Sequence, residues 1–208
     1  GKKALVRMNV RASSSAKGEI ALSARSFNTN VNHEIAPVYQ TVTVRKGDNP
    51  LEMELPMGQN FLTWDEFSPA LYRLTATLKN GKQIETKQVQ FGMREFTING
   101  KWFYVNGRKT MLRGTVENCD FPLTGYAPMD VASWERVFRI CRNYGLNHMR
   151  FHSFCPPEAA FIAADLVGFY LQPEGPSWPN HGPKLGNGQP IDKYLMDETI
   201  ALTKAYGN

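Results

Sequence analysis

Residues 146–157 read LNHMRFHSFCPP and residues 168–178 read GFYLQPEGPSW, with an alanine-rich segment between them. Residues 146–151 and 169–171 predict two short strands, and residues 158–167 predict a helix. Strands joined through a helix form a parallel βαβ unit. Polar and aromatic residues follow each strand directly, so we expect them to meet at the carboxyl edge of a parallel sheet, where such sheets bind ligands.

The residues before this stretch extend the same pattern. Residues 102–105 and 109–113 flank Asn106-Gly107, which predicts a hairpin. From Asp130 the apolar period becomes about 3.6 residues, which predicts a helix that is capped by Asp130 and stopped by Gly145. A last helix is predicted over residues 192–206. The sheet could be open or closed, but residues 113–117 lack a glycine-rich phosphate-binding turn, which favours a barrel.

Residues 1–94 have a different character. Short runs of alternating apolar and polar residues, such as Val6, Met8 and Val10 with Arg7 and Asn9 between them, are separated by turn residues. About seven strands in this length are typical of an immunoglobulin-like sandwich. We therefore predict a multidomain β plus α/β fold: an immunoglobulin-like β-sandwich over residues 1–94, then a partial (β/α)8 TIM barrel over residues 95–208. A complete barrel has eight βα units, so we expect truncation before barrel strand four.

Composition excludes several classes of protein. Of the 208 residues, 42% are hydrophobic and 21% charged, as in ordinary globular proteins. No apolar run reaches about 18 residues, so we expect no membrane span. The net charge is +5, but the basic residues are dispersed and match no nucleic-acid-binding motif, so we expect no nucleic-acid partner. Cys119, Cys141 and Cys155 form neither a disulfide framework nor a zinc pattern. No cofactor is implied, and the compartment cannot be read from the sequence.

Several segments resemble, in the correct order, those of glycoside hydrolase family 2. Three parts of the family are resembled: its Trp-Ser-Pro-x-x-Pro-x-Leu-Tyr segment, its Gly-Phe-Arg linker and the opening strands of its barrel. The resemblance is carried by residues 62–65, 71–74, 91–96, 98–100, 106–107, 112–114, 150–157 and 168–171 with Glu174. The family includes β-galactosidases, β-glucuronidases and β-mannosidases. Residues 115–119 and 151–156 depart from its usual pattern in loops that line the sugar pocket, so the sugar stays open.

The resemblance implies retaining hydrolysis of terminal β-linked sugars by two glutamates about 5 Å apart. In the family, the acid/base follows barrel strand four and the nucleophile follows strand seven. Residues 206–208 resemble the lead-in to strand four, so both glutamates would lie beyond Asn208. We therefore assign no catalytic residue within this chain and expect it to be inactive alone.

Eight residues are predicted to bind the carbohydrate substrate. Carboxylates, guanidinium groups and imidazoles can bond sugar hydroxyls, and a tryptophan can stack on a sugar ring. By the resemblance, Arg150 reaches the nucleophile and keeps it ionised. The alternative for each residue is a structural or solvent-exposed role. The predicted residues are Arg113, Glu117, Arg150, His152, Ser153, Glu174, Trp178 and His181.

Other interpretations stay open. His148 and His152 are four residues apart, but on a strand that spacing spans about 13 Å, so they cannot share a metal ion. The chain could be a non-catalytic module that binds carbohydrate or another partner. It could also be a small α/β enzyme that uses Glu117, Glu174 or a cysteine. Because a partial barrel leaves strand edges unpaired, we expect the chain alone to be marginally stable or to self-associate.

Overall fold

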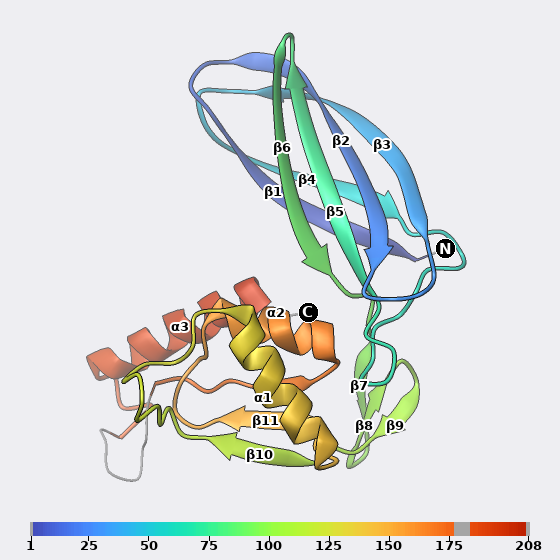
Figure 1. Ribbon diagram of the computed structural model, residues 1–208. Helices are drawn as coiled ribbons and strands as arrows, with labels where there is room; N and C mark the ends of the chain where they lie inside the picture. The colour runs from blue at the N-terminus through green and yellow to red at the C-terminus, as the bar shows by residue number, and fades with distance from the viewer. Residues whose placement is uncertain (1, 177–183, 207–208) are drawn as a thin grey trace. The chain divides into compact units, whose positions relative to one another are not determined.

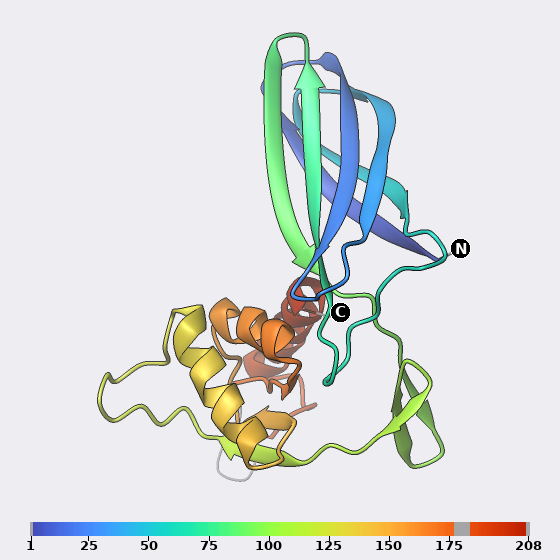
Figure 2. The same cartoon turned by 45° about the vertical axis from the view of Figure 1, so that its right-hand side comes forward.

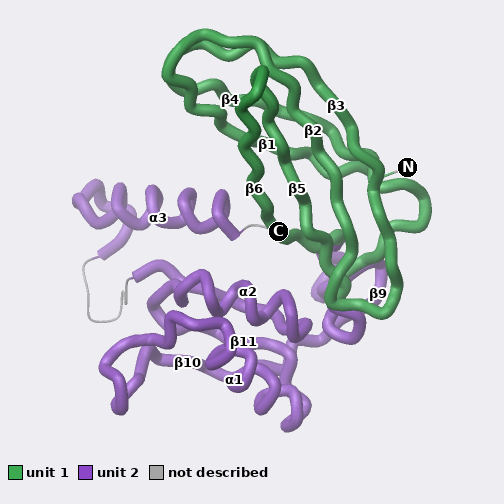
Figure 3. Tube along the Cα trace, turned by 45° about the horizontal axis from the view of Figure 1, so that its top comes forward, with its two compact units in different colours: residues 1–64, 70–93 green, residues 65–69, 94–208 purple. Residues whose placement is uncertain are grey.

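The computed structural model describes residues 2–176 and 184–206, and the chain divides into two compact units (Figure 3). Unit 1 comprises residues 1–64 and 70–93, and unit 2 comprises residues 65–69 and 94–208. No helix of the described residues is long and apolar enough to cross a membrane.

Unit 1 is a sandwich of two antiparallel sheets (Figures 1 and 2). One sheet has two strands and the other has four, in the order β3-β2-β5-β6, so the described part of the unit contains six strands rather than about seven. The strands are β1 (Lys3–Ala12), β2 (Ala16–Phe27), β3 (Glu34–Val44), β4 (Gly47–Pro56), β5 (Leu71–Asn80) and β6 (Gln83–Phe91).

Alternate residues of these strands build the core of unit 1. Ile20, Leu22, Leu55 and Leu74 are buried between the sheets, while their sequence neighbours face outward. Buried residues thus alternate along these strands with the same period of two as the apolar residues in the sequence. Gly81 and Lys82 connect β5 to β6, with Gly81 in the left-handed region at φ +57°.

Unit 2 begins with a small antiparallel sheet, β7 (Phe96–Asn99), β8 (Trp102–Val105) and β9 (Arg108–Thr110). Asn106 and Gly107 connect β8 to β9 with φ values of +51° and +75°. Positive φ at both positions is what a two-residue hairpin turn of type I′ requires, which explains the Asn-Gly pair.

A three-stranded parallel sheet in the order β10-β11-β12 follows. Helices α1 and α2 connect its strands, and Trp134, Phe138, Phe151 and Phe169 pack between helices and sheet. The rings of Phe138 and Phe169 stack with centroids 4.8 Å apart. The elements are β10 (Gly114–Glu117), α1 (Val131–Asn143), β11 (His148–Phe151), α2 (Glu158–Val167), β12 (Tyr170–Gln172) and α3 (Pro190–Tyr206).

The amino ends of β10 and β11 are fixed by a buried polar cluster. The Asn147 amide donates to the Glu66 carboxylate at 2.9 Å, and its Oδ1 accepts the Arg113 backbone N–H at 2.7 Å. The Glu66 carboxylate is 3.5 Å from Nη2 of Arg113, and its backbone oxygen accepts a bond from Arg142. Glu66 comes from the short segment between β4 and β5, so this excursion of the chain is an integral part of unit 2.

We expect Asn147→Ala to lower the free energy of unfolding of unit 2 by about 2 kcal/mol, because one buried and two part-buried hydrogen bonds lose their partner. Urea unfolding followed by ellipticity at 222 nm checks this, since all described helices belong to unit 2. Asn143→Ala, at an exposed position of α1, is the control. Equal stability of the two variants would contradict the role assigned to Asn147.

Candidate functional site

The carboxyl ends of β10, β11 and β12 meet at one edge of the parallel sheet. Glu117 is the last residue of β10 and pairs with Phe151, the last residue of β11. Arg150 pairs with Gln172, the last residue of β12, and Glu174 follows two residues later. The register therefore brings polar residues from three separate segments to the same edge.

An ion pair between Arg150 and Glu174 is the centre of this edge. Nε of Arg150 donates to Oε1 of Glu174 at 2.5 Å, and the backbone N–H of Ser153 donates to Oε2 at 2.9 Å. Both side chains are partly exposed, at 39% for Arg150 and 26% for Glu174. Ser153 adopts φ +62°, an uncommon value for a residue other than glycine, and this turn directs its N–H toward the carboxylate.

These contacts keep Glu174 ionised. The hydrogen bond from Arg150 is the largest influence and lowers the pKa of Glu174; burial opposes it, and the Ser153 N–H adds to the lowering. A carboxylate with a lowered pKa is a poor proton donor near neutral pH. Glu174 is therefore suited to hold a neighbouring group or a hydroxyl in place.

Glu117, the last residue of β10, and His152, which directly follows β11, are neighbours at the same edge. Oε1 of Glu117 accepts the backbone N–H of Asp120 at 3.2 Å, and its backbone oxygen accepts the N–H of His152 at 2.8 Å. The second bond extends the β10–β11 ladder beyond the strands. Asp120 was not among the predicted residues. It contributes a backbone N–H, and the residue type does not reveal such a contribution.

The existing contacts of Glu174 argue against Glu117 and Glu174 as a retaining pair. Their strands lie on opposite sides of β11, so their backbones are about 10 Å apart and the two side chains would have to approach each other across β11. Retaining glycosidases hold their two carboxyl groups about 5 Å apart. Glu174 is also committed to Arg150 and Ser153.

Arg113 is among the residues predicted to bind substrate, but it does not lie at the carboxyl edge of the parallel sheet, whose first strand is β10. The strand begins at Gly114, so Arg113 lies at the amino edge of the sheet, opposite to Glu117. There its Nε donates to the Gly145 backbone oxygen at 2.7 Å. Trp178 and His181, also predicted to bind substrate, lie outside the described residues.

The described part of the chain offers no metal centre, and burial disfavours the thiolate form of two of its cysteines. No group of three His, Cys, Asp or Glu residues there could hold a metal ion. Burial lowers the pKa of His148, which favours its neutral form, although a hydrogen bond with Gln172 opposes this. Burial raises the pKa of Cys141 and of Cys155, so neither is a ready thiolate.

We expect Arg150→Met to raise the pKa of Glu174 toward its ordinary value, because the main stabilising contact of the carboxylate is lost. In the parent chain, the Arg150–Glu174 ion pair persists at a pH above the pKa of an unfolded glutamate, about 4.3. The ion pair is lost as the pH falls through the lower pKa that Glu174 has in the folded chain. Titration of the carboxyl carbon by NMR checks both. Arg136→Met, at an exposed position of α1, is the control and should leave the Glu174 titration unchanged.

Comparison with known proteins identifies the chain. The sequence profile of the glycosyl hydrolases of family 2 matches residues 1–94. A β-galactosidase of Thermoanaerobacter pseudethanolicus is 31% identical over 145 residues, covering 68% of this chain and 19% of the relative. A putative β-glucuronidase of Formosa agariphila is 32% identical over 127 residues, covering 60% of this chain and 15% of the relative. The chain thus spans less than a fifth of the length of the curated relatives it matches.

Solved structures share the fold. A family 2 member from Bacteroides cellulosilyticus superposes with a TM-score of 0.79 at 20% identity, covering 99% of this chain and 27% of that one. The Bacteroides uniformis β-glucuronidase gives a TM-score of 0.78 at 18% identity, covering 98% of this chain and 25% of that one. The chain therefore belongs to the glycosyl hydrolases of family 2 and is related to β-galactosidases and β-glucuronidases.

Proposed function

We propose that this chain is part of a retaining β-glycosidase that releases terminal β-linked sugars from oligo- or polysaccharides. The observation that carries the proposal is the Arg150–Glu174 pair at the carboxyl edge of the parallel sheet, in a chain of family 2. In this proposal residues 1–94 form an immunoglobulin-like domain. Residues 95–208 supply the first part of a (β/α)8 barrel, and β10, β11 and β12 are its first three strands.

The proposed role of the chain is to form one wall of the sugar pocket. Among the described residues, only Nε of the Arg150 guanidinium has a hydrogen-bond partner, so both Nη groups are left for a ligand. A guanidinium fixed through one edge presents its remaining donors in a set direction, which suits a carboxylate or a pair of sugar hydroxyls. Glu174 acts as the positioning residue for Arg150, while Glu117, His152 and Ser153 line the adjoining loops.

The two catalytic carboxyl groups are proposed to lie outside these 208 residues. Retaining hydrolysis needs one carboxyl group that is protonated and a second that attacks the sugar, about 5 Å apart. Glu174 is held ionised by its bonds with Arg150 and Ser153, and the backbone of Glu117 lies about 10 Å from that of Glu174, across two strand spacings. The coverage of less than a fifth of the curated relatives is consistent with this placement.

The experiment compares the 208-residue chain with the whole protein that its gene encodes. On p-nitrophenyl β-galactoside, β-glucuronide and β-mannoside, we expect no turnover by the chain alone. The whole protein should cleave one of these glycosides, and proton NMR should show the β-anomer forming first. Turnover by the 208-residue chain that is lost in Glu174→Gln would overturn the proposed location of catalysis. A whole protein that binds a sugar without cleaving it would favour a non-catalytic module.

In the whole protein, we expect Arg150→Met to lower kcat/KM by about 100-fold or more, as for the loss of a charged group that stabilises the transition state. Arg136→Met is the matched control and should retain parent activity. A reduction below about threefold for Arg150→Met would show that this guanidinium does not reach the reacting sugar or the nucleophile.

A further inference from the structure

Unit 1 carries a hollow of about 580 Å³ where the loop between β2 and β3 meets the outer face of the four-stranded sheet. Arg25, Arg73, Thr75 and Gln88 line its floor. Leu74, which lies between Arg73 and Thr75 in the sequence, belongs to the core, so these two side chains point away from the core. Arg25 and Gln88 pair with Arg73 and Thr75 and therefore share that face. The volume of the hollow is typical of a small-molecule site.

The wall of this hollow is a loop that its own hydrogen bonds hold in place. The hydroxyl of Ser26, a buried residue, donates to the backbone oxygen of Val31 and accepts the N–H of His33, each at 2.8 Å. The backbone N–H of Ser26 also donates to the His33 oxygen at 2.9 Å. Asn30 and Asn32 of this loop line the hollow. Their side-chain amides are thus carried by a backbone that is ordered without a ligand, which lowers the entropy cost of binding one.

Two arginines lie side by side on the floor, and none of the described residues that line the hollow is acidic. Arg25 and Arg73 are directly opposite in the β2–β5 ladder, and like charges at such positions destabilise a strand pair. Nε of Arg25 donates to Asn32 at 3.3 Å and lies 3.2 Å from the Glu34 carboxylate, while its Nη groups form no hydrogen bond with a described residue. The guanidinium carbon of Arg73 lies 4.8 Å from the centre of the Phe27 ring, and this guanidinium forms no hydrogen bond or ion pair with a described residue. A bound anion would relieve the repulsion and supply acceptors to both groups.

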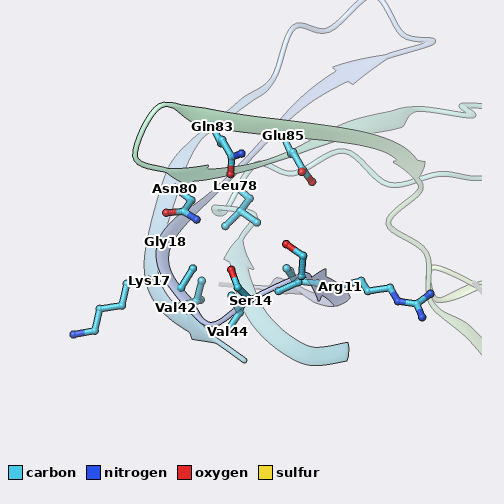
Figure 4. Close-up of a pocket in the computed structure, with 14 residues that line it drawn as sticks. Arg11, Ser14, Lys17, Gly18, Val42, Val44, Leu78, Asn80, Gln83 and Glu85 are labelled. Atoms are coloured by element: carbon cyan, nitrogen blue, oxygen red, sulfur yellow. The ribbon is translucent and has the colours of Figure 1, made fainter. Parts of the chain in front are cut away.

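Another hollow of unit 1, of about 150 Å³, lacks this arrangement (Figure 4). The charged ends of Arg11 and Lys17 are directed away from it, and the acidic residue Glu85 is part of its lining. Arg11 is also 3.8 Å from the Asp48 carboxylate. The positive net charge of the chain therefore does not by itself line a hollow with cations, and Arg11 offers a control of equal charge.

We propose that the hollow over Arg25 and Arg73 binds a uronate residue, that is, a sugar that carries a carboxylate, within an acidic polysaccharide. A guanidinium fork matches a carboxylate through two parallel hydrogen bonds. The ring of Phe27, which lies against the guanidinium of Arg73, limits the directions in which Arg73 can present its fork. The side-chain amides of the lining and the hydroxyl of Thr75 can bond the hydroxyls of the sugar.

The choice of a sugar over an acidic peptide rests on the proposed function and on the chemistry of the lining. Extended peptides are commonly bound through main-chain hydrogen bonds to a sheet edge, whereas this hollow lies on a sheet face and offers side-chain amides and hydroxyls. Unit 1 contains none of the residues of the proposed sugar pocket. A uronate site in this unit would therefore hold a polysaccharide independently of catalysis and raise its effective concentration at the enzyme.

Calorimetric titration with α-1,4-linked tetragalacturonate tests the inference in the 208-residue chain and in the whole protein that its gene encodes. The α-linkage is not a substrate of a β-glycosidase, so binding is measured without turnover. We expect both proteins to bind the tetragalacturonate and to bind its methyl ester at least about tenfold more weakly, because esterification removes the charge of the carboxylate. Amide resonances of residues 29–32 should shift when the tetragalacturonate is added.

Single substitutions identify the groups that bind. Arg25→Met and Arg73→Met should each weaken binding at least about tenfold, the loss typical of a hydrogen bond to a charged group. Arg73→Lys keeps the charge but loses the planar fork, so it should weaken binding by a similar factor. Arg11→Met, which removes the same charge beside the hollow of Figure 4, is the matched control and should bind as the parent does. All three arginines are exposed, so the variants are expected to fold.

Several results would overturn the inference: no binding by either protein, equal affinity for the methyl ester, or parent affinity in both Arg25→Met and Arg73→Met. Binding by the 208-residue chain that the whole protein lacks would show that another part of the polypeptide covers the hollow, and would overturn it too. Dextran sulfate or poly-L-glutamate that binds as tightly as tetragalacturonate would reveal a general anion surface in place of a uronate site. Uronate binding by a whole protein that is inactive on every glycoside would reject the proposed function alone, whereas an active enzyme without uronate binding would reject this inference alone.

Discussion

The hydrogen bond from the Asn147 amide to the buried carboxylate of Glu66 is the contact on which the second unit depends. Asn147 precedes β11, and its Oδ1 holds the backbone of Arg113 just before β10. The starting points of two strands are thereby fixed against each other. Because parallel strands share their register along their length, the same contact determines where their carboxyl ends lie. The positions of Glu117 and Arg150 therefore follow from the contacts of Asn147.

At the carboxyl edge, a second polar contact has a different purpose. Arg150 and Glu174 are partly exposed, so their pairing contributes little to stability. The pair instead fixes the orientation of the two groups. Nε of Arg150 is bonded to Glu174, the Glu174 carboxylate is also held by the Ser153 N–H, and the side of the guanidinium away from Nε is presented outward. Without these contacts, rotation about the side-chain bonds would leave the Arg150 guanidinium and the Glu174 carboxylate without a fixed orientation.

The local elements of the fold were predictable because single residues determine them. Asn106-Gly107 forms its hairpin since both positions need positive φ, and Asp130 caps α1 through the Ser133 N–H at 2.8 Å. Gly145 and Gly168 follow α1 and α2 in the left-handed region. Such signals act within a few residues and can be read without the rest of the structure.

The part of the site that sequence patterns missed depends on distant contacts. Arg113 was placed at the wrong edge because the strand boundary moved by a few residues, and strand ends carry weak local signals. The role of Glu66 could not be predicted, since no pattern in residues 65–69 indicates that they belong to the second unit. Residue types alone therefore indicate Arg150 and Glu174 as members of the proposed site, but they do not reveal the framework that positions these two residues.

Residues 65–69, which carry Glu66, also constrain the order in which the two units can fold. Glu66 and Asn147 are separated by 81 positions, so a ribosome releases the acid long before its amide partner. The nascent sandwich must hold residues 65–69 outside its own strands while the later segment is synthesised. An evolutionary exchange of the sandwich at a single junction would likewise remove the anchor of the following sheet, so the two units are expected to be inherited together.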